Sequence, residues 1–167
     1  MKYLLFILSC FALISSCTNP FAPTLSNNQD SNNVISDQRN VIGIFNNWSY
    51  AYKFKDTLVY GNLLDRNFSF AYRNHEKGLD LTWSRDQEMI STYRIFVAAN
   101  TLDLVWNDQI NSIGDSLNIQ ISRGFTLKIV FSADEIIQIQ GRATVVLIRP
   151  NIQTDWRILF WRDESEF

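Results

Sequence analysis

The spacing of apolar residues changes once along this chain, near residue 100, and that change decides which folds are open to it. Before Asn100, apolar side chains recur every three or four residues, which is the period of a helix with one buried face. After Asn100 they alternate with polar side chains, which is the period of a strand with one buried face. Helices followed by hairpin-connected strands predict an α+β domain, with N-terminal helices packed on a curved antiparallel sheet.

The first half of this pattern predicts three helices and one strand. The first helix is expected to begin after Asn40, which can cap it, and to end near Lys55. A short second helix follows Asp56, then a turn at 65–67, a strand over 68–72 and a loop over 73–82. Ser84 and Gln87 have the spacing of a capping box. They start a third helix, whose expected apolar stripe is Met89, Tyr93 and Phe96.

The second half predicts a run of strands. Alternation covers 102–106, 117–121, 125–131 and 137–147, and a final strand covers 156–160. Turns are expected at 132–135 and 150–155. Two small residues, Gly141 and Ala143, lie in the middle of the long strand, where they indicate a bulge or the close approach of a helix or ligand.

The N-terminus has the layout of a secretory signal. Lys2 precedes an apolar run of about 12 residues, which is shorter than the ~20 that a membrane-spanning helix needs. The run ends in Ile14-Ser15-Ser16-Cys17, which resembles the bacterial lipobox, whereas the residues before Cys10 match it poorly. The resemblance implies cleavage before Cys17 and acylation of its thiol, as with palmitate. The alternative is an ordinary signal peptide with an unmodified Cys17.

Three segments are therefore expected: a signal peptide over 1–16, a flexible tether over 17–39 and one domain over 40–167. The tether is rich in Asn and Ser and contains two of the three prolines. Thr18 after the cysteine, where an Asp would resemble a signal for inner-membrane retention, favours the outer membrane, facing the periplasm. Loss of Lys2 with the signal changes the formal net charge from −2 to −3. This dispersed acidic balance argues against a nucleic-acid partner.

The predicted order of elements resembles the nuclear transport factor 2-like, cystatin-like cone fold, and local residues strengthen the likeness. The segment 47–52 (NWSYAY), with Asp56, Tyr60 and Phe68 after it, looks like the opening of a group of bacterial lipoproteins with this fold. The segment 156–163 looks like their final strand, W-x-I-x-x-W-x-D. The superfamily includes ketosteroid isomerases, dehydratases, polyketide cyclases and transport adaptors, so the resemblance implies a fold and leaves the activity open.

Catalysis in such a cone would need an acid or a base inside it. Alternation directs Asp80 and Asp103 outward, and we assign the remaining carboxylates to turns, to the first turn of a helix or to the C-terminus, where Asp163 lies. Glu88 is the exception, because it borders the apolar stripe of the third helix. We expect it either to be structural, in an ion pair with Arg85 or a cap contact, or to line a pocket.

The single histidine, His75, falls in a charged loop and is expected to be solvated. One histidine and no thiol beyond Cys17 in the mature chain predict no metal site and no cofactor. Aromatic side chains on the periodic faces either form core or line a pocket for an apolar ligand. The candidate pocket residues are Tyr52, Tyr60, Trp83, Glu88, Trp106 and Trp156. Trp161 is expected on the opposite strand face from Trp156, under a loop or on a sheet face that pairs with a second copy in a homodimer.

These patterns predict a membrane-anchored, periplasm-facing lipoprotein without catalytic residues, which binds a small apolar ligand or an envelope protein. The alternative is a small isomerase, dehydratase or hydrolase with an acid–base site inside the cone. The two differ in one structural feature, because an enzyme needs an open cavity with a desolvated carboxylate.

Overall fold

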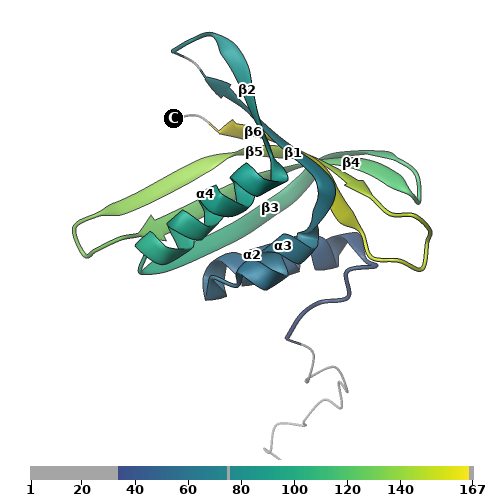
Figure 1. Ribbon diagram of the computed structural model, residues 1–167, viewed down its shortest axis with the longest axis horizontal. Coiled ribbons are helices and arrows are strands. Elements are labelled where there is room, and N and C mark those ends of the chain that lie inside the picture. The colour runs from purple at the N-terminus through teal and green to yellow at the C-terminus, as the bar shows by residue number, and fades with distance from the viewer. Residues whose placement is uncertain (1–33, 75, 166–167) are drawn as a thin grey trace, which may run out of the picture. The chain divides into compact units, whose positions relative to one another are not determined.

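The computed structural model describes residues 34–74 and 76–165, which form three helices and six strands (Figure 1). The predicted signal, Cys17, most of the predicted tether and His75 lie outside the described residues. None of the helices in the described ranges is long and apolar enough to cross a membrane.

The helices begin where the sequence predicts. Helix α2 (Val41–Phe54) starts after Asn40, whose side chain accepts a hydrogen bond from the Ile42 amide at 3.2 Å, and ends at Lys55 in the left-handed conformation. Helix α3 (Thr57–Leu63) is capped by Asp56. Helix α4 (Arg85–Ala98) starts with the predicted capping box of Ser84 and Gln87. All three caps satisfy amides that the first helical turn leaves free.

The six strands form one sheet in the order β2-β1-β6-β5-β4-β3. Their bounds are β1 Leu64–Asn74, β2 Leu79–Ser84, β3 Thr101–Gly114, β4 Asn118–Val130, β5 Ile136–Ile148 and β6 Arg157–Ser165. The α+β class is confirmed, but the prediction of an antiparallel sheet needs correction. The last strand, β6, lies beside β1 and runs parallel to it, while all other pairs are antiparallel.

Two expected irregular segments near the start of the sheet are strands. Residues 65–67, predicted as a turn, belong to β1, and part of the predicted loop over 73–82 is β2, paired with β1 as a hairpin. The polar residues of this segment still bond to each other, because the Asp65 side chain accepts a hydrogen bond from the Asn67 amide at 2.8 Å. The pairing of β1 with β6 shifts register between Leu64 and Ser69. The turn-like sequence therefore makes an irregular strand start and not a reversal of the chain.

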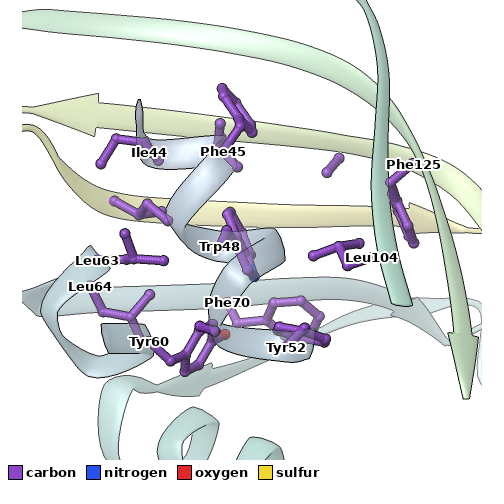
Figure 2. Packing of buried hydrophobic residues seen from close by; sticks show 14 of the residues in the cluster. Ile44, Phe45, Trp48, Tyr52, Tyr60, Leu63, Leu64, Phe70, Leu104 and Phe125 are labelled. Carbon is purple, nitrogen blue, oxygen red and sulfur yellow. The ribbon is translucent and has the colours of Figure 1, made fainter. Parts of the chain in front are cut away.

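The helices lie on one face of the sheet, and the core fills the space between them (Figure 1). Helix α2 packs on β3 and supplies Ile44, Phe45, Trp48 and Tyr52, which point from the helix into the core (Figure 2). Trp48 and Tyr60 are fully buried. Burial of these large aromatic side chains contributes much of the stability of a domain of this size.

Trp161 is partly buried and packs against the core, which corrects the expectation that it sits under a loop or on an outer sheet face. In the pairing of β5 with β6, Leu147 faces Ile158 and Val146 faces Phe160, so Leu159 is the extra residue of a β-bulge. A bulge shifts the alternation of side chains by one position. Ile158 and Trp161 therefore face inward together, and the Trp161 ring packs against Trp48 with centroids 4.9 Å apart. The expectation of a homodimer rested on an exposed Trp161, so this argument for a dimer no longer applies.

The inner face of helix α4 was predicted in part. Phe96 is buried and Met89 packs against the core, as expected, whereas Tyr93 is 57% exposed. Glu88 and Thr92 are buried beside Phe96, because the Tyr60 and Thr92 hydroxyls donate hydrogen bonds to the Glu88 carboxylate. The inner side of α4 is therefore partly polar, which an argument from apolar residues alone does not detect.

Residues before α2 pack on the domain. The buried Asn47 side chain accepts from the Ser36 amide at 2.7 Å and donates to the Ser36 carbonyl at 2.9 Å. The Gln38 side chain donates to the Trp156 carbonyl, and the Trp156 amide donates to the Gln38 carbonyl. Packing on the domain therefore begins by Ser36, a few residues before the start at 40 expected from the sequence.

Candidate functional site

A buried carboxylate lies where α3, α4 and β2 meet. The Glu88 side chain, on a residue only 3% exposed, accepts from the Tyr60 hydroxyl at 2.6 Å, the Thr92 hydroxyl at 2.8 Å and the Trp83 indole N–H at 2.7 Å. Burial, and then the neighbouring Glu88 carboxylate, raise the pKa of Tyr60 well above its usual value. Tyr60 therefore stays a protonated donor to Glu88.

The partners of Glu88 are not those expected from the sequence. Arg85 instead donates to the Gly61 carbonyl at 3.0 Å, on the neighbouring helix α3. Within the described residues, Glu88 forms no ion pair. A carboxylate buried without a cation is held by its hydrogen bonds alone, so each of these three donors matters to the fold.

The space between α2 and the sheet is almost filled. It amounts to a cavity of about 20 Å³, enclosed by apolar and aromatic side chains: Trp48, Tyr52, Leu104, Trp106, Phe125, Leu127 and Trp161. A cavity of this size has room for about one water molecule. Burial, and then the charge of Glu88, raise the pKa of Tyr52, so its hydroxyl also stays protonated.

Three indole N–H groups around this cavity have no hydrogen-bond acceptor in the described structure; they belong to Trp48, Trp106 and Trp161. The rings pack on one another, because the Trp48 centroid lies 4.9 Å from those of both other rings, with Trp161 nearly perpendicular to it. Perpendicular packing places the edge of one ring against the face of the other, which is a favourable arrangement for aromatic pairs. The cluster is thus held by ring packing.

Asp163 is a carboxylate on the inner face that the sequence argument missed. It follows Trp161 by two residues on β6, between Tyr72 of β1 and Ala143 of β5. Burial raises its pKa, and a hydrogen bond from the Ser165 amide at 2.9 Å opposes that effect only partly. We expected it at the C-terminus, outside the core. The odd spacing of Ile158 and Trp161 was the available signal, because two inward residues three apart require a bulge between them.

Trp156 lies apart from the other candidate pocket residues. It is buried, and the Arg149 guanidinium covers its ring at 4.2 Å. A hollow of about 600 Å³ opens against Trp156 on the outside of the domain; it is lined also by Asp37 and Arg39, and it shares Arg149 with a second hollow of about 710 Å³. This mixed polar hollow is separate from the residues that enclose the cavity in the core.

The candidate residues thus separate into three places. Tyr60, Trp83 and Glu88 form the buried hydrogen-bonded cluster, while Tyr52 and Trp106 line the small cavity. Trp156 lies at the outer hollow, and Cys17 and His75 fall outside the described residues. Over 34–74 and 76–165, His, Cys, Asp and Glu side chains do not gather into a group that could hold a metal ion.

Comparison with known proteins rests on structure, because no family model and no curated relative matches the sequence. A nuclear transport factor 2-like protein from Cytophaga hutchinsonii matches with a TM-score of 0.59 at 12% identity, over 75% of this chain and 95% of that chain. The fold is nuclear transport factor 2-like. The fold that the sequence resembled is therefore confirmed, while the lipobox is not tested by these comparisons.

Two further structures with this likeness show how widely such domains differ. The Kfla4162 protein from Kribbella flavida matches with a TM-score of 0.65 at 11% identity, over 78% of this chain and 91% of that chain. A putative scytalone dehydratase from Novosphingobium aromaticivorans matches with a TM-score of 0.65 at 10% identity, over 83% and 89%. At this identity the likeness concerns the fold alone.

Proposed function

We propose that this chain is a lipid-anchored, periplasm-facing domain that binds a partner or supports envelope assembly through its outer surface, without a catalytic site in its cone. The observation that carries this proposal is the packed interior. The cavity of about 20 Å³ is far smaller than the roughly 300–1,000 Å³ of pockets that take small-molecule ligands.

The buried Glu88 cluster supports the same proposal. A general base must come within about 2.6–3.2 Å of the proton that it removes. Both oxygens of Glu88 already accept hydrogen bonds from protein donors, and the residue is almost completely buried. A substrate would have to displace Tyr60, Thr92 or Trp83 to reach it. We therefore assign Glu88 a structural role.

The anchoring part of the proposal rests on the N-terminal sequence. Ile14-Ser15-Ser16-Cys17 supplies the acylated cysteine, and residues 18–33 join it to the domain. Two or more acyl chains would hold the chain stably in a bilayer. The outer membrane, with the domain facing the periplasm, is the proposed location.

A second candidate function is an acid–base enzyme, and Asp163 is the observation that favours it. A carboxyl group with a raised pKa on the inner face of a cone is the kind of group that general acid catalysis uses. The neighbour named a putative scytalone dehydratase has the same fold. For this candidate, the interior would have to open beside Trp161.

Thermal unfolding with small ligands separates the two candidates. We expect saturating cyclic ketones and phenols to leave the melting temperature of the mature chain unchanged, because the cone has no room for them. A ligand at 100 times its Kd would add about 2.7 kcal/mol of stability, which raises the melting temperature by several degrees in a domain of this size. Such a rise, lost in Asp163→Asn, would favour the enzyme and contradict the packed-domain proposal.

A further inference from the structure

Helix α4 carries three large apolar side chains on its outer face. Ile90, Tyr93 and Val97 are 52%, 57% and 66% exposed, and their spacing of three and four residues puts them on one face. The opposite face buries Glu88 and Thr92 together with Phe96. The outer face of a helix in a domain is usually polar, so this exposed apolar stripe calls for a partner that covers it.

A fourth apolar side chain, Leu58 of α3, joins this stripe. Gly61 lies against the Met89 side chain, and the Arg85 side chain reaches the Gly61 carbonyl. Leu58 is on the same face of α3 as Gly61, and Tyr93 is on the same face of α4 as Met89, because residues three or four apart share a face. Leu58 is 79% exposed. We call Leu58, Ile90, Tyr93 and Val97 the helical patch.

Basic side chains border the helical patch. Arg94 is exposed between Tyr93 and Val97, and in the described structure it forms no ion pair. The Lys55 side chain bonds the Ala99 carbonyl, which brings the end of α2 to the end of α4. The exposed Lys53 therefore lies at that end too, with its ammonium 5.8 Å from the Phe54 ring. The exposed Asp86, in the first turn of α4, lies on the same face one turn before Ile90, so an acidic residue borders the other end of the helical patch.

We propose that the helical patch lies against the surface of an anionic bilayer. Apolar side chains bordered by Lys and Arg are the composition of protein surfaces that sink about 5–10 Å into the headgroup region. Each basic residue near an anionic surface adds to the electrostatic attraction. The inference rests on the proposed anchoring of the chain at Cys17, which would keep the helical patch close to lipid.

The length of chain between anchor and domain permits this contact. Residues 18–33 separate Cys17 from Val34, and that many residues span at most about 60 Å. Helix α2, with 14 residues, is about 21 Å long, so the patch at the far end of α2 from Val34 remains within reach of the bilayer. Anchoring converts a weak patch–lipid contact into a local one at high effective concentration.

A second copy of this chain is the competing occupant. In a two-fold dimer a residue meets a different residue of the other copy, so Arg94 of one copy could approach Asp86 of the other. We choose the bilayer because the proposed anchor at Cys17 holds the helical patch close to lipid. Self-association is an outcome of the test below.

Vesicle binding by the unacylated chain tests the helical patch separately from the anchor. The mature chain, residues 17–167 with Cys17→Ser, retains the whole described core and is mixed with vesicles of phosphatidylglycerol and phosphatidylethanolamine. We expect co-sedimentation that weakens with salt. Replacing Leu58, Tyr93 and Val97 with Ser should weaken binding at least about tenfold, or about 1.4 kcal/mol. The matched control replaces three exposed residues elsewhere, Ile110, Ile113 and Ile152, with Ser and should bind like the parent chain.

The outcomes separate the possibilities. Equal binding by patch and control variants, or no binding of the parent chain at millimolar lipid, would overturn the lipid proposal. A concentration-dependent dimer, seen by light scattering and lost only in the patch variant, would assign the helical patch to a second copy and also overturn it. Vesicle binding is measured on the unacylated chain, whereas the proposed anchor is tested by whether Cys17 is acylated. The lipid-contact proposal and the anchor proposal can therefore fail independently.

Discussion

At the scale of single residues, Glu88 is the side chain on which the most buried polar contacts depend. Tyr60 and Thr92 both donate to its Oε1, and Trp83 donates to its Oε2. Glu88→Gln keeps the shape but places an amide N–H₂ opposite one of these donors. We expect a loss of about 1–3 kcal/mol in the free energy of unfolding, the cost of one unsatisfied buried donor.

Denaturant titration of Glu88→Gln and a matched variant measures this loss. The exposed Glu76, which forms no ion pair in the described structure, provides the control as Glu76→Gln, with an expected change within about 0.5 kcal/mol. If both variants unfold at the same denaturant concentration, the Glu88 cluster does not stabilise the fold.

The raised pKa of Asp163 predicts that its contribution to stability changes with pH in the opposite direction to that of most carboxylates. Burial raises its folded-state pKa above the usual 3.8, so the unfolded chain ionises first as the pH rises. Stability contributed by this group is therefore greatest below 3.8 and falls as the pH rises towards the folded-state pKa. Asp163→Asn should stabilise the domain at pH 7 and give no gain near pH 3.5.

Thermal unfolding of both chains over this pH range is the measurement. The difference between the variant and the parent chain isolates Asp163 from other acids, such as Asp80, whose pKa is lowered by hydrogen bonds from Arg162 and Arg73. A stabilisation that stays constant from pH 3.5 to 7 would contradict the assignment of a raised pKa to Asp163.

At the scale of elements, the segment before α2 acts as part of the domain. Asn47 satisfies its buried amide entirely through the Ser36 backbone. A chain that begins at Gln38 leaves both polar atoms of Asn47 without these partners. We expect it to melt at least about 5 °C below a chain that begins at Val34, since each unsatisfied buried group costs about 1–3 kcal/mol.

Ser36→Ala in the longer chain is the matched control. Its backbone bonds to Asn47 remain, and the hydroxyl contacts only the exposed Asn46 side chain at 3.4 Å. The variant should therefore melt like the parent. Equal melting temperatures for the chains beginning at 34 and 38 would show that the segment adds no stability.

The starts of the helices were easier to predict than the direction in which strand residues point. Caps at Asn40, Asp56 and Ser84 act within a few residues, so local sequence contains the whole signal. The inward position of Trp161 depends on a bulge at Leu159, which exists only in the pairing of β6 with β5. The polar inner side of α4 likewise depends on Tyr60, 28 residues away from Glu88.

At the scale of the whole molecule, the predicted class and cone-like fold were right because the change of hydrophobic period persists over many residues. The parallel pairing of β1 with β6 joins segments far apart in the sequence, such as Leu64 with Ile158, and an alternating pattern does not show whether two strands run parallel or antiparallel. The candidate pocket was predicted only in part. Periodicity identified Tyr52 and Trp106 as inward, but whether inward side chains leave a cavity depends on three-dimensional packing.

The central claim is that a packed domain is held to the membrane by Cys17, and the mass of the N-terminal peptide tests it most directly. Full-length protein is expressed in a bacterium with lipoprotein processing, extracted from membranes and digested. We predict a peptide that begins at Cys17 and carries acyl chains; it should persist in Cys10→Ser and disappear in Cys17→Ser. An unmodified peptide that retains residues 1–16, or a soluble chain cleaved elsewhere, would contradict the account.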